Sequence, residues 1–208
     1  MKNEFISKIL NNMKLPPKRY DKPFIIALSG HCGSGKSHVA KVFSKELQLY
    51  IVGGDSVRWK IRKEPSLPQD VTSINNLTNE ICYLEIEKLL KENVSVVIDK
   101  STSSIKDLEN LEKYNLPIIL ISLVTNHEQN RKRVTDRSNQ EMINMPGYGD
   151  IDSISDIITE ELYDQVVGRK TYNIPLDRFD YTIDATVKLE VELKEAEKIA
   201  KKIAKKYN

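Results

Sequence analysis

Cysteine is scarce in this sequence, and long apolar runs are missing. Cys32 and Cys82 are the two cysteines among 208 residues; they are too few for a disulfide framework, and their separation matches no metal-ligand spacing. A reduced, cytoplasmic setting is therefore the simplest expectation. No stretch approaches the ~18–20 apolar residues that a membrane span requires, and residues 1–20 show no small-residue cleavage site. The sequence predicts a soluble protein without a signal peptide or a membrane contact.

An excess of one sign of charge is also missing. The chain has 32 Lys and Arg residues against 30 Asp and Glu residues, a formal net charge of +2. This balance lacks the electrostatic footprint of a dedicated duplex binder, although it does not exclude a local basic groove. The composition is 39% hydrophobic and 30% charged, without low-complexity tracts, as in ordinary globular chains. The length suits one α/β domain with a sizeable core.

Short apolar runs alternate with helical stretches along the chain. The runs of strand length are 24–29, 49–53, 94–99, 117–124 and 181–185, and the helical stretches between them are 37–48, 74–92, 105–114 and 127–139. A continuous apolar run indicates a strand that is buried on both faces, and strands alternating with helices form βαβ units. The pattern predicts a parallel sheet covered by helices on both faces.

The remaining segments fall outside this alternation. Residues 1–21 are expected to form a helical appendage to a domain that spans 22–208, because Pro16 and Pro17 stop the first helix. Residues 56–73 are polar and are expected to form a loop or short helices, and a further helix is expected at 153–167. The tail 188–207 is predicted to be a helix that packs on the domain edge. Its apolar seam is Leu189, Leu193, Ala196, Ala200 and Ile203.

A phosphate-binding motif, G-x-x-x-x-G-K-[ST], lies between the first apolar run and the first long helix. Its residues are Gly30, His31, Cys32, Gly33, Ser34, Gly35, Lys36 and Ser37. Glycines let the backbone curl around an oxyanion, so that N–H groups and a helix N-terminus point at the phosphates. Lys36 is expected to reach the β and γ oxygens of ATP, and the Ser37 hydroxyl to bind Mg²⁺. The rest of the loop is assigned to nucleotide binding, with Cys32 interpreted as a small filler residue.

Acidic residues follow two of the predicted strands. Asp55 comes after the second strand, with Arg58 three residues further on, and Asp99 ends the third strand. Strand carboxyl ends line the ligand crevice of such sheets, so Asp55 can accept the proton of an attacking hydroxyl; an N-cap is the alternative. Asp99 is interpreted as a Walker-B carboxylate that holds Mg²⁺ or orients Arg58, with a capping role as the alternative.

Two arginines follow the fourth predicted strand. Arg133 and Arg137 are four residues apart and share a helix face. Small P-loop kinases carry an arginine-bearing lid at this place, so a lid is expected over about 126–150, with Gly147 and Gly149 as its hinge. The alternative is a solvated face whose charges pair with Glu128 and Asp136.

These pieces together resemble the P-loop kinases related to polynucleotide 5′-hydroxyl kinases, zeta toxins and chloramphenicol phosphotransferase. The resemblance covers about residues 22–186 and implies a P-loop kinase fold, an α/β fold with a five-stranded parallel sheet of order 2-3-1-4-5. It implies further that Asp55 is the general base and that Arg58 contacts the acceptor. Arg133 and Arg137 would stabilise the transferring phosphoryl group, and Ala185 and Thr186 would lie near the adenine. The expected site also includes the phosphate-loop residues and the strand-end acid described above: Gly30, Cys32, Gly33, Ser34, Gly35, Lys36, Ser37 and Asp99.

One departure concerns the acceptor side. Relatives commonly continue the third strand with Asp-Ala-Thr-Asn, whereas this sequence has Asp99-Lys100-Ser101-Thr102. Resemblance at this level indicates the reaction better than the substrate. The expected activity is a kinase that transfers the γ-phosphoryl group of ATP to a hydroxyl, with Mg²⁺ as cofactor. The acceptor is either a small molecule or a nucleic-acid 5′ end. The alternative is a nucleotide-hydrolysing switch without a dedicated acceptor.

Overall fold

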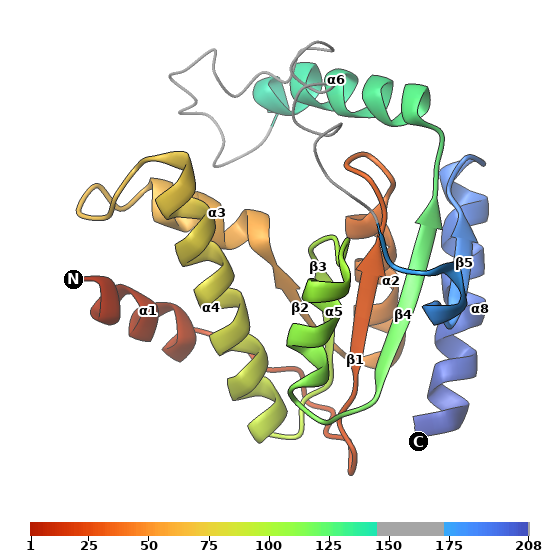
Figure 1. The fold of residues 1–208 in the computed structure, drawn as a ribbon, viewed down its shortest axis with the longest axis horizontal. Coiled ribbons are helices and arrows are strands. Elements are labelled where there is room, and N and C mark those ends of the chain that lie inside the picture. Colours follow the sequence, from red (N-terminus) through yellow and green to blue (C-terminus); the bar gives the residue numbers. More distant parts are fainter. Residues whose placement is uncertain (145–172, 208) are drawn as a thin grey trace.

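A five-stranded parallel sheet forms the centre of the molecule (Figure 1). The structure, a computed structural model, describes residues 1–144 and 173–207, and of residues 137–144 the backbone alone. The strands are β1 (Ile25–Ser29), β2 (Tyr50–Gly53), β3 (Val96–Asp99), β4 (Ile118–Val124) and β5 (Tyr181–Asp184). Their spatial order is β2-β3-β1-β4-β5, and the four neighbouring pairs are parallel. The predicted fold class and strand order are confirmed.

Helices connect the strands and cover both faces of the sheet (Figure 1). They are α1 (Lys2–Asn11), α2 (Lys36–Leu47), α3 (Gly54–Arg62), α4 (Val71–Lys91), α5 (Ile105–Glu112), α6 (His127–Asn144) and α8 (Leu189–Tyr207), with a short 3₁₀ helix, η2 (Leu176–Arg178), before β5. The polar stretch 56–73 therefore holds most of α3 and the start of α4. The helix expected at 153–167 lies outside the described residues. Within the described residues, no helix is both long and apolar enough to cross a membrane.

The core is divided by the sheet into two clusters. Side chains of β1 alternate between them: Ile25 and Ala27 pack with α4 and α5, whereas Ile26 and Leu28 pack with α2 and α8. All five residues of β1 are buried. A strand buried on both faces has no polar side to show, which explains its continuous apolar run.

The register brings several strand ends to one edge. Gly53 of β2 pairs with Asp99 of β3, and Ser29 of β1 pairs with Ser122 of β4. The loops that follow these strands therefore meet above the same edge, and α6 crosses above it in Figure 1.

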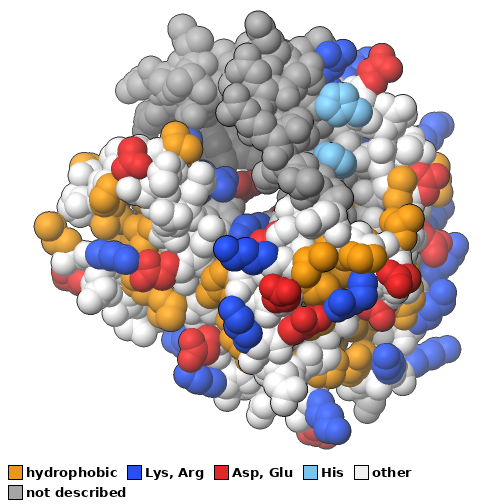
Figure 2. Space-filling view, viewed as in Figure 1, with side chains coloured by type: hydrophobic (Ala, Val, Ile, Leu, Met, Phe, Trp, Pro, Cys, Tyr) orange, Lys and Arg blue, Asp and Glu red, His pale blue; other side chains and the backbone are white. Residues whose placement is uncertain are grey.

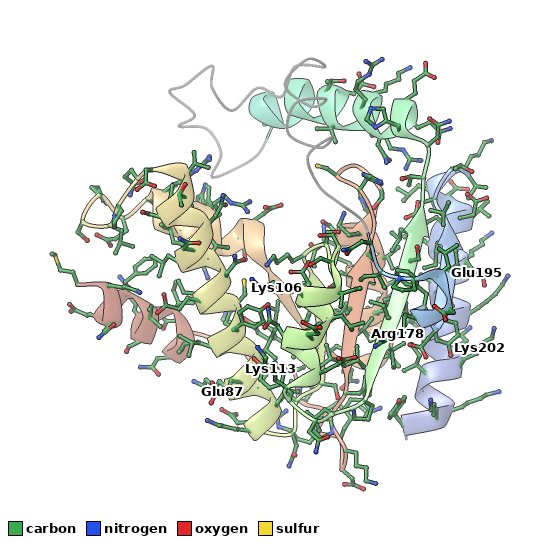
Figure 3. All side chains as sticks on the ribbon, in the orientation of Figure 1. Glu87, Lys106, Lys113, Arg178, Glu195 and Lys202 are labelled. Atoms are coloured by element: carbon green, nitrogen blue, oxygen red, sulfur yellow. The ribbon has the colours of Figure 1, made fainter. Side chains whose placement is uncertain are left out.

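The segments before β1 and β5 are tied to the rest of the molecule by polar contacts. Lys88 Nζ of α4 donates to the Leu10 carbonyl of α1 at 2.8 Å, and the buried Tyr20 hydroxyl donates to the Leu47 carbonyl at 2.7 Å. Arg178 of η2, labelled in Figure 3, pairs with Glu112 of α5 at 2.6 Å. These contacts fix where both segments enter the sheet.

Ala196, Ala200 and Ile203 of the predicted α8 seam are buried, but its two leucines are not. Leu189 is 41% exposed, because it begins the helix, and Leu193 is only partly buried. The buried residues of α8 are Glu192, Ala196, Ile199, Ala200 and Ile203. The seam is therefore rotated toward α2, and it begins with a carboxylate rather than with a leucine.

Candidate active site

The loop from Gly30 to Ser37 joins β1 to α2. Gly33 and Gly35 have φ of +83° and +90°, values that residues with a Cβ rarely adopt. Space is also restricted: a Cβ at Gly33 would lie 2.7 Å from the Asn130 carbonyl oxygen of α6, and one at Gly35 would overlap the Glu192 carboxylate of α8. The loop is thus enclosed by α6 on one side and by α8 on the other.

Lys36 lies across this loop. Its Nζ donates to the carbonyl oxygens of Gly30 and His31, at 2.8 Å each, while Ser34 beneath it is fully buried. From the adjacent strand end, Ser101 Oγ donates to the Gly30 carbonyl at 3.0 Å. The lysine charge is therefore held at the loop, where phosphate oxygens would be the stronger acceptors.

Ser37 and Asp99 meet at the mouth of the loop. Ser37 Oγ donates to Asp99 Oδ1 at 3.1 Å, whereas α5 is capped by Ser104 and Asp107, so Asp99 is not its cap. Burial raises the pKa of Asp99, and the nearby Asp55 charge raises it further, against the hydrogen bond from Ser37. Nearby cations would favour its ionised form.

This pair suits Mg²⁺ chemically. A hydroxyl and a carboxylate supply oxygen ligands, and Mg²⁺ is commonly bound through one or two carboxylates together with substrate phosphates and water. Among the described residues, no group of three or more His, Cys, Asp or Glu side chains could hold a metal ion. Ser37 and Asp99 are the residues that would hold Mg²⁺ beside a nucleotide.

Asp55 lies in the first turn of α3, above the end of β2. The N-cap of α3 is Gly53, without a side-chain cap hydrogen bond, so Asp55 is not the cap. Its side chain is 82% exposed and forms an ion pair with Arg58 one turn along. Asp55 is near enough to Asp99 for its charge to raise the pKa of Asp99. Asp55 is thus exposed to solvent beside the loop, with Arg58 at its side.

The structure describes the side chain of only one of the two predicted lid arginines. Arg133 of α6 is half-buried, and its Nη1 lies 3.5 Å from the Gly33 carbonyl oxygen. Arg137 belongs to α6, but its side chain lies outside the described part, as do Gly147 and Gly149. One arginine is therefore beside the phosphate loop, and the other remains a prediction.

The two residues that are expected to lie near the adenine, Ala185 and Thr186, follow β5. Ala185 is fully buried, and its N–H donates to the Val124 carbonyl at 2.8 Å. The Thr186 hydroxyl and N–H both donate to Asp184 Oδ1, at 2.6 and 2.9 Å. Cys32 is half-buried in the loop. Of these two residues, Thr186 is thus the one exposed to a ligand.

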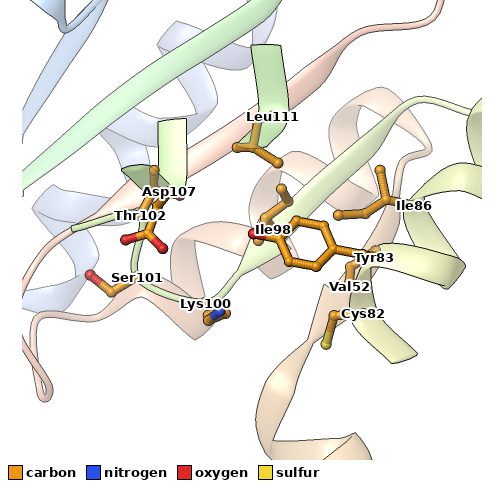
Figure 4. Close-up of a pocket in the computed structure, with 10 residues that line it drawn as sticks. All are labelled: Val52, Cys82, Tyr83, Ile86, Ile98, Lys100, Ser101, Thr102, Asp107 and Leu111. Atoms are coloured by element: carbon orange, nitrogen blue, oxygen red, sulfur yellow. The ribbon is translucent and has the colours of Figure 1, made fainter. Parts of the chain in front are cut away.

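A small cavity lies beside β3, on the face of the sheet that α4 and α5 cover (Figure 4). Its volume is about 30 Å³, room for about two water molecules. Its lining residues are Val52, Cys82, Tyr83, Ile86, Ile98, Lys100, Ser101, Thr102, Asp107 and Leu111. Lys100 Nζ donates to Asn79 Oδ1 of α4 at 2.7 Å. After Asp99, where the sequence departs from that of the relatives, Lys100 is therefore a cation that is hydrogen-bonded to α4.

Two buried glutamates near this edge have no counterpart among the predicted site residues. Glu85 of α4 and Glu192 of α8 are 4% and 1% exposed. Burial raises the pKa of each to about 7, against the attraction of Lys60 for Glu85 and of Arg133 for Glu192. The sequence contained a signal of this burial, because each glutamate lies about one helical turn from apolar residues on the same helix face. The signal is weak, because a glutamate in a charged helix is usually solvated.

A family model described as an AAA domain (AAA_33) matches residues 25–150, more than half of the chain. The chain belongs to this AAA domain family. The matched part of this AAA domain runs from β1 through α6, so it includes the phosphate loop, Asp55, Asp99 and Arg133. It begins and ends inside the predicted kinase-like region 22–186.

Sequence relatives match about half of the chain. A UPF0200 protein of Pyrobaculum aerophilum is 30% identical over 115 residues, 54% of this chain and 66% of the relative. An adenylate kinase of Ureaplasma urealyticum is 27% identical over 122 residues, 54% of this chain and 57% of the relative. The chain thus spans less than two thirds of the length of these relatives.

Solved structures resemble the chain over most of its length. A proposed kinase from Chloroflexus aurantiacus has a TM-score of 0.63 at 18% identity, covering 89% of this chain and 98% of that one. The APS kinase of Mycobacterium tuberculosis, solved with AMPPNP and APS, has a TM-score of 0.55 at 14% identity, covering 91% and 98%. At these identities the comparison shows the fold alone, a P-loop kinase fold.

Proposed function

We propose that this AAA domain is a phosphotransferase that moves the γ-phosphoryl group of ATP to a hydroxyl acceptor. The observation that carries the proposal is the meeting of Lys36, Ser37 and Asp99 at one strand edge, with Ser37 Oγ 3.1 Å from Asp99 Oδ1. The adenylate kinase relative and the APS kinase neighbour support it, since both names denote kinases. Phosphoryl transfer relies mostly on positioning and charge neutralisation, which such a site can supply.

Each side chain has a defined task in this proposal. Lys36 leaves the loop carbonyls and binds the β and γ oxygens, while the backbone N–H groups of the loop orient the phosphates. Mg²⁺, held by Ser37 and Asp99, would neutralise charge that develops on the phosphates. Asp55, exposed beside the loop, accepts the proton of the acceptor hydroxyl. Arg58 binds the acceptor, and Arg133 contacts the transferring group from α6.

A small-molecule acceptor is favoured over a nucleic-acid 5′ end. On the face drawn in Figure 2, basic and acidic side chains are interspersed rather than gathered by sign. One basic residue at the end of α3 already has a local partner, since Lys63 Nζ lies 4.0 Å from the Trp59 ring centroid. The charge of Lys60 opposes the rise in the pKa of the buried Glu85. A polynucleotide would need a continuous basic path.

A transfer assay tests the proposal. The protein is incubated with γ-labelled ATP and Mg²⁺, together with a panel of nucleosides, sugars, antibiotics and oligonucleotides. Label should pass to a small hydroxyl compound with the wild type and not with Lys36→Ala. ADP released equally with and without every acceptor would instead favour a hydrolysing switch. Label on oligonucleotides, with an affinity that falls steeply with salt, would move the acceptor class to nucleic acid.

A further inference from the structure

Glu192 is a buried carboxylate beside the phosphate loop that the proposed reaction does not use. It lies in the first turn of α8 and is 1% exposed. Neither Oε1 nor Oε2 has a hydrogen-bond partner among the described residues. A buried carboxylate without a partner is costly to a fold. The surroundings of Glu192 should therefore contain a group that offsets this cost.

Gly35 contacts this carboxylate, and Arg133 of α6 is a cation in its surroundings. From the start of α2, Gly35 lies so close that a Cβ there would overlap Oε1, and a helix N-terminus favours an anion. From α6, Arg133 is the cation whose charge acts on Glu192. Lys36, the other nearby cation of the loop, is engaged by the Gly30 and His31 carbonyls. Arg133 is thus the side chain best suited to pair with Glu192.

The present contact of Arg133 is weak. Its Nη1 is 3.5 Å from the Gly33 carbonyl oxygen, at the outer limit of hydrogen bonding. A carboxylate is a stronger acceptor for a guanidinium than a carbonyl is. A guanidinium carries five N–H donors, so one edge can bind a carboxylate while the other binds a phosphate.

We infer that Glu192 is a positioning residue: its buried carboxylate, which has no hydrogen-bond partner among the described residues, pairs with the Arg133 guanidinium once that side chain leaves the Gly33 carbonyl, and the pair holds α6 against the phosphate loop. The pair joins α6 to α8 behind Gly33 and Gly35, and it fixes the direction in which the free edge of Arg133 points. Its benefit to phosphoryl transfer rests on the proposed function. The ion pair itself does not, because it concerns only residues of this chain.

A double-mutant cycle on urea unfolding tests the ion pair without any ligand. The variants are Arg133→Gln, Glu192→Gln and both together, measured at pH 8, where the carboxyl is ionised. Arg133→Gln should lower the urea midpoint of the wild type and leave that of Glu192→Gln unchanged. The same cycle at pH 5 should show additive effects, because a neutral carboxyl has no charge to pair. The control is Lys132→Gln, which removes the adjacent exposed charge of α6 and should be additive with Glu192→Gln at both pH values.

Additive effects of Arg133→Gln and Glu192→Gln at pH 8 would overturn the inference, as would equal coupling for Lys132→Gln. A second assay then measures the consequence for catalysis. Glu192→Gln should lower kcat roughly 10- to 100-fold, the cost of a misplaced reacting group, with ATP affinity unchanged, while Glu190→Gln in the same turn is silent. Coupling in urea without any transfer activity would refute the proposed function and leave the ion pair standing. Transfer activity without coupling would do the reverse.

Discussion

Two regions at the carboxyl edge of the sheet are built from different chemical groups. On the phosphate side, β1, α2, α6 and α8 enclose a loop whose contacts run largely through backbone carbonyls, glycines and one lysine. On the side where we propose that the acceptor binds, here called the acceptor side, β2, β3, α3 and α4 present side chains: Asp55, Arg58, Lys100 and the lining of a small cavity. A phosphate is the same group in every nucleotide, so backbone geometry suffices to bind it. An acceptor varies, and side chains can be exchanged without refolding the loop.

The phosphate side should show the largest loss on substitution. Lys36→Ala removes the cation expected on the β and γ oxygens, so phosphoryl transfer should become undetectable and nucleotide affinity should fall. Lys45→Ala, exposed near the other end of α2, is the matched control and should behave as wild type. Transfer rates with labelled ATP and calorimetric nucleotide affinities measure both. Wild-type behaviour of Lys36→Ala would remove the basis for assigning this loop to ATP.

Arg133 tests whether α6 belongs to the phosphate side. Arg133→Ala should lower kcat by about 10³–10⁵, the usual effect of an arginine that meets the transferring group as charge develops, with little change in ATP affinity. Arg133→Lys should not restore the rate, because an ammonium lacks the guanidinium fork. Steady-state kinetics would check this against Lys132→Ala. If both variants were equally mild, α6 would be only a solvated helix.

Asp55 is the corresponding test of the acceptor side. Asp55→Asn should lower kcat by roughly 10²–10⁴, the usual effect of losing a general base, and should leave nucleotide binding near normal. Asp99→Asn should instead raise the Mg²⁺ concentration needed for half-maximal rate. Magnesium titrations of both variants would separate the roles. A large loss for Asp99→Asn with near-normal turnover for Asp55→Asn would exchange them.

The smallest expected effect compares the two buried glutamates, one in each region. Burial raises the pKa of Glu85 and of Glu192 from 4.5 to about 7. Between these values each folded-state carboxyl keeps a proton that the unfolded chain has released, so the contribution of these two groups to stability is largest below about pH 4.5 and falls as pH rises to 7. Each group should cost on the order of 1–3 kcal/mol of unfolding free energy.

Urea unfolding from pH 5 to pH 8 measures that cost. Glu85→Gln and Glu192→Gln should each reduce the decline in unfolding free energy with pH, and their effects should add because the residues lie on opposite faces of the sheet. Glu190→Gln should keep the wild-type slope. An unchanged slope in either glutamine variant would mean that its carboxyl does not titrate in this range.

The sequence was most informative where one local rule decides the structure. The apolar runs predicted the strands because both faces are covered, and the spacing of Gly30, Lys36 and Ser37 predicted the loop. Glu192 was missed because its identity indicates solvent, while its burial depends on how α8 packs on α2. The cavity of Figure 4 was unpredictable for a similar reason, since β2, α4, β3 and α5 contribute to its lining. The pairing of Arg58 with Asp55 likewise depends on where α3 begins.

The close approach of Gly35 and Glu192 brings the phosphate loop, which lies early in the chain, into contact with α8, the last described helix. A ribosome-bound chain synthesised only through β5 would contain the complete phosphate motif but not the wall that α8 places behind it. Docking of α8 and occupation of the loop are therefore linked equilibria, and a ligand that binds only the finished loop must stabilise the docked helix. Nucleotide should slow amide hydrogen exchange in α8, far along the chain from any residue that touches phosphate.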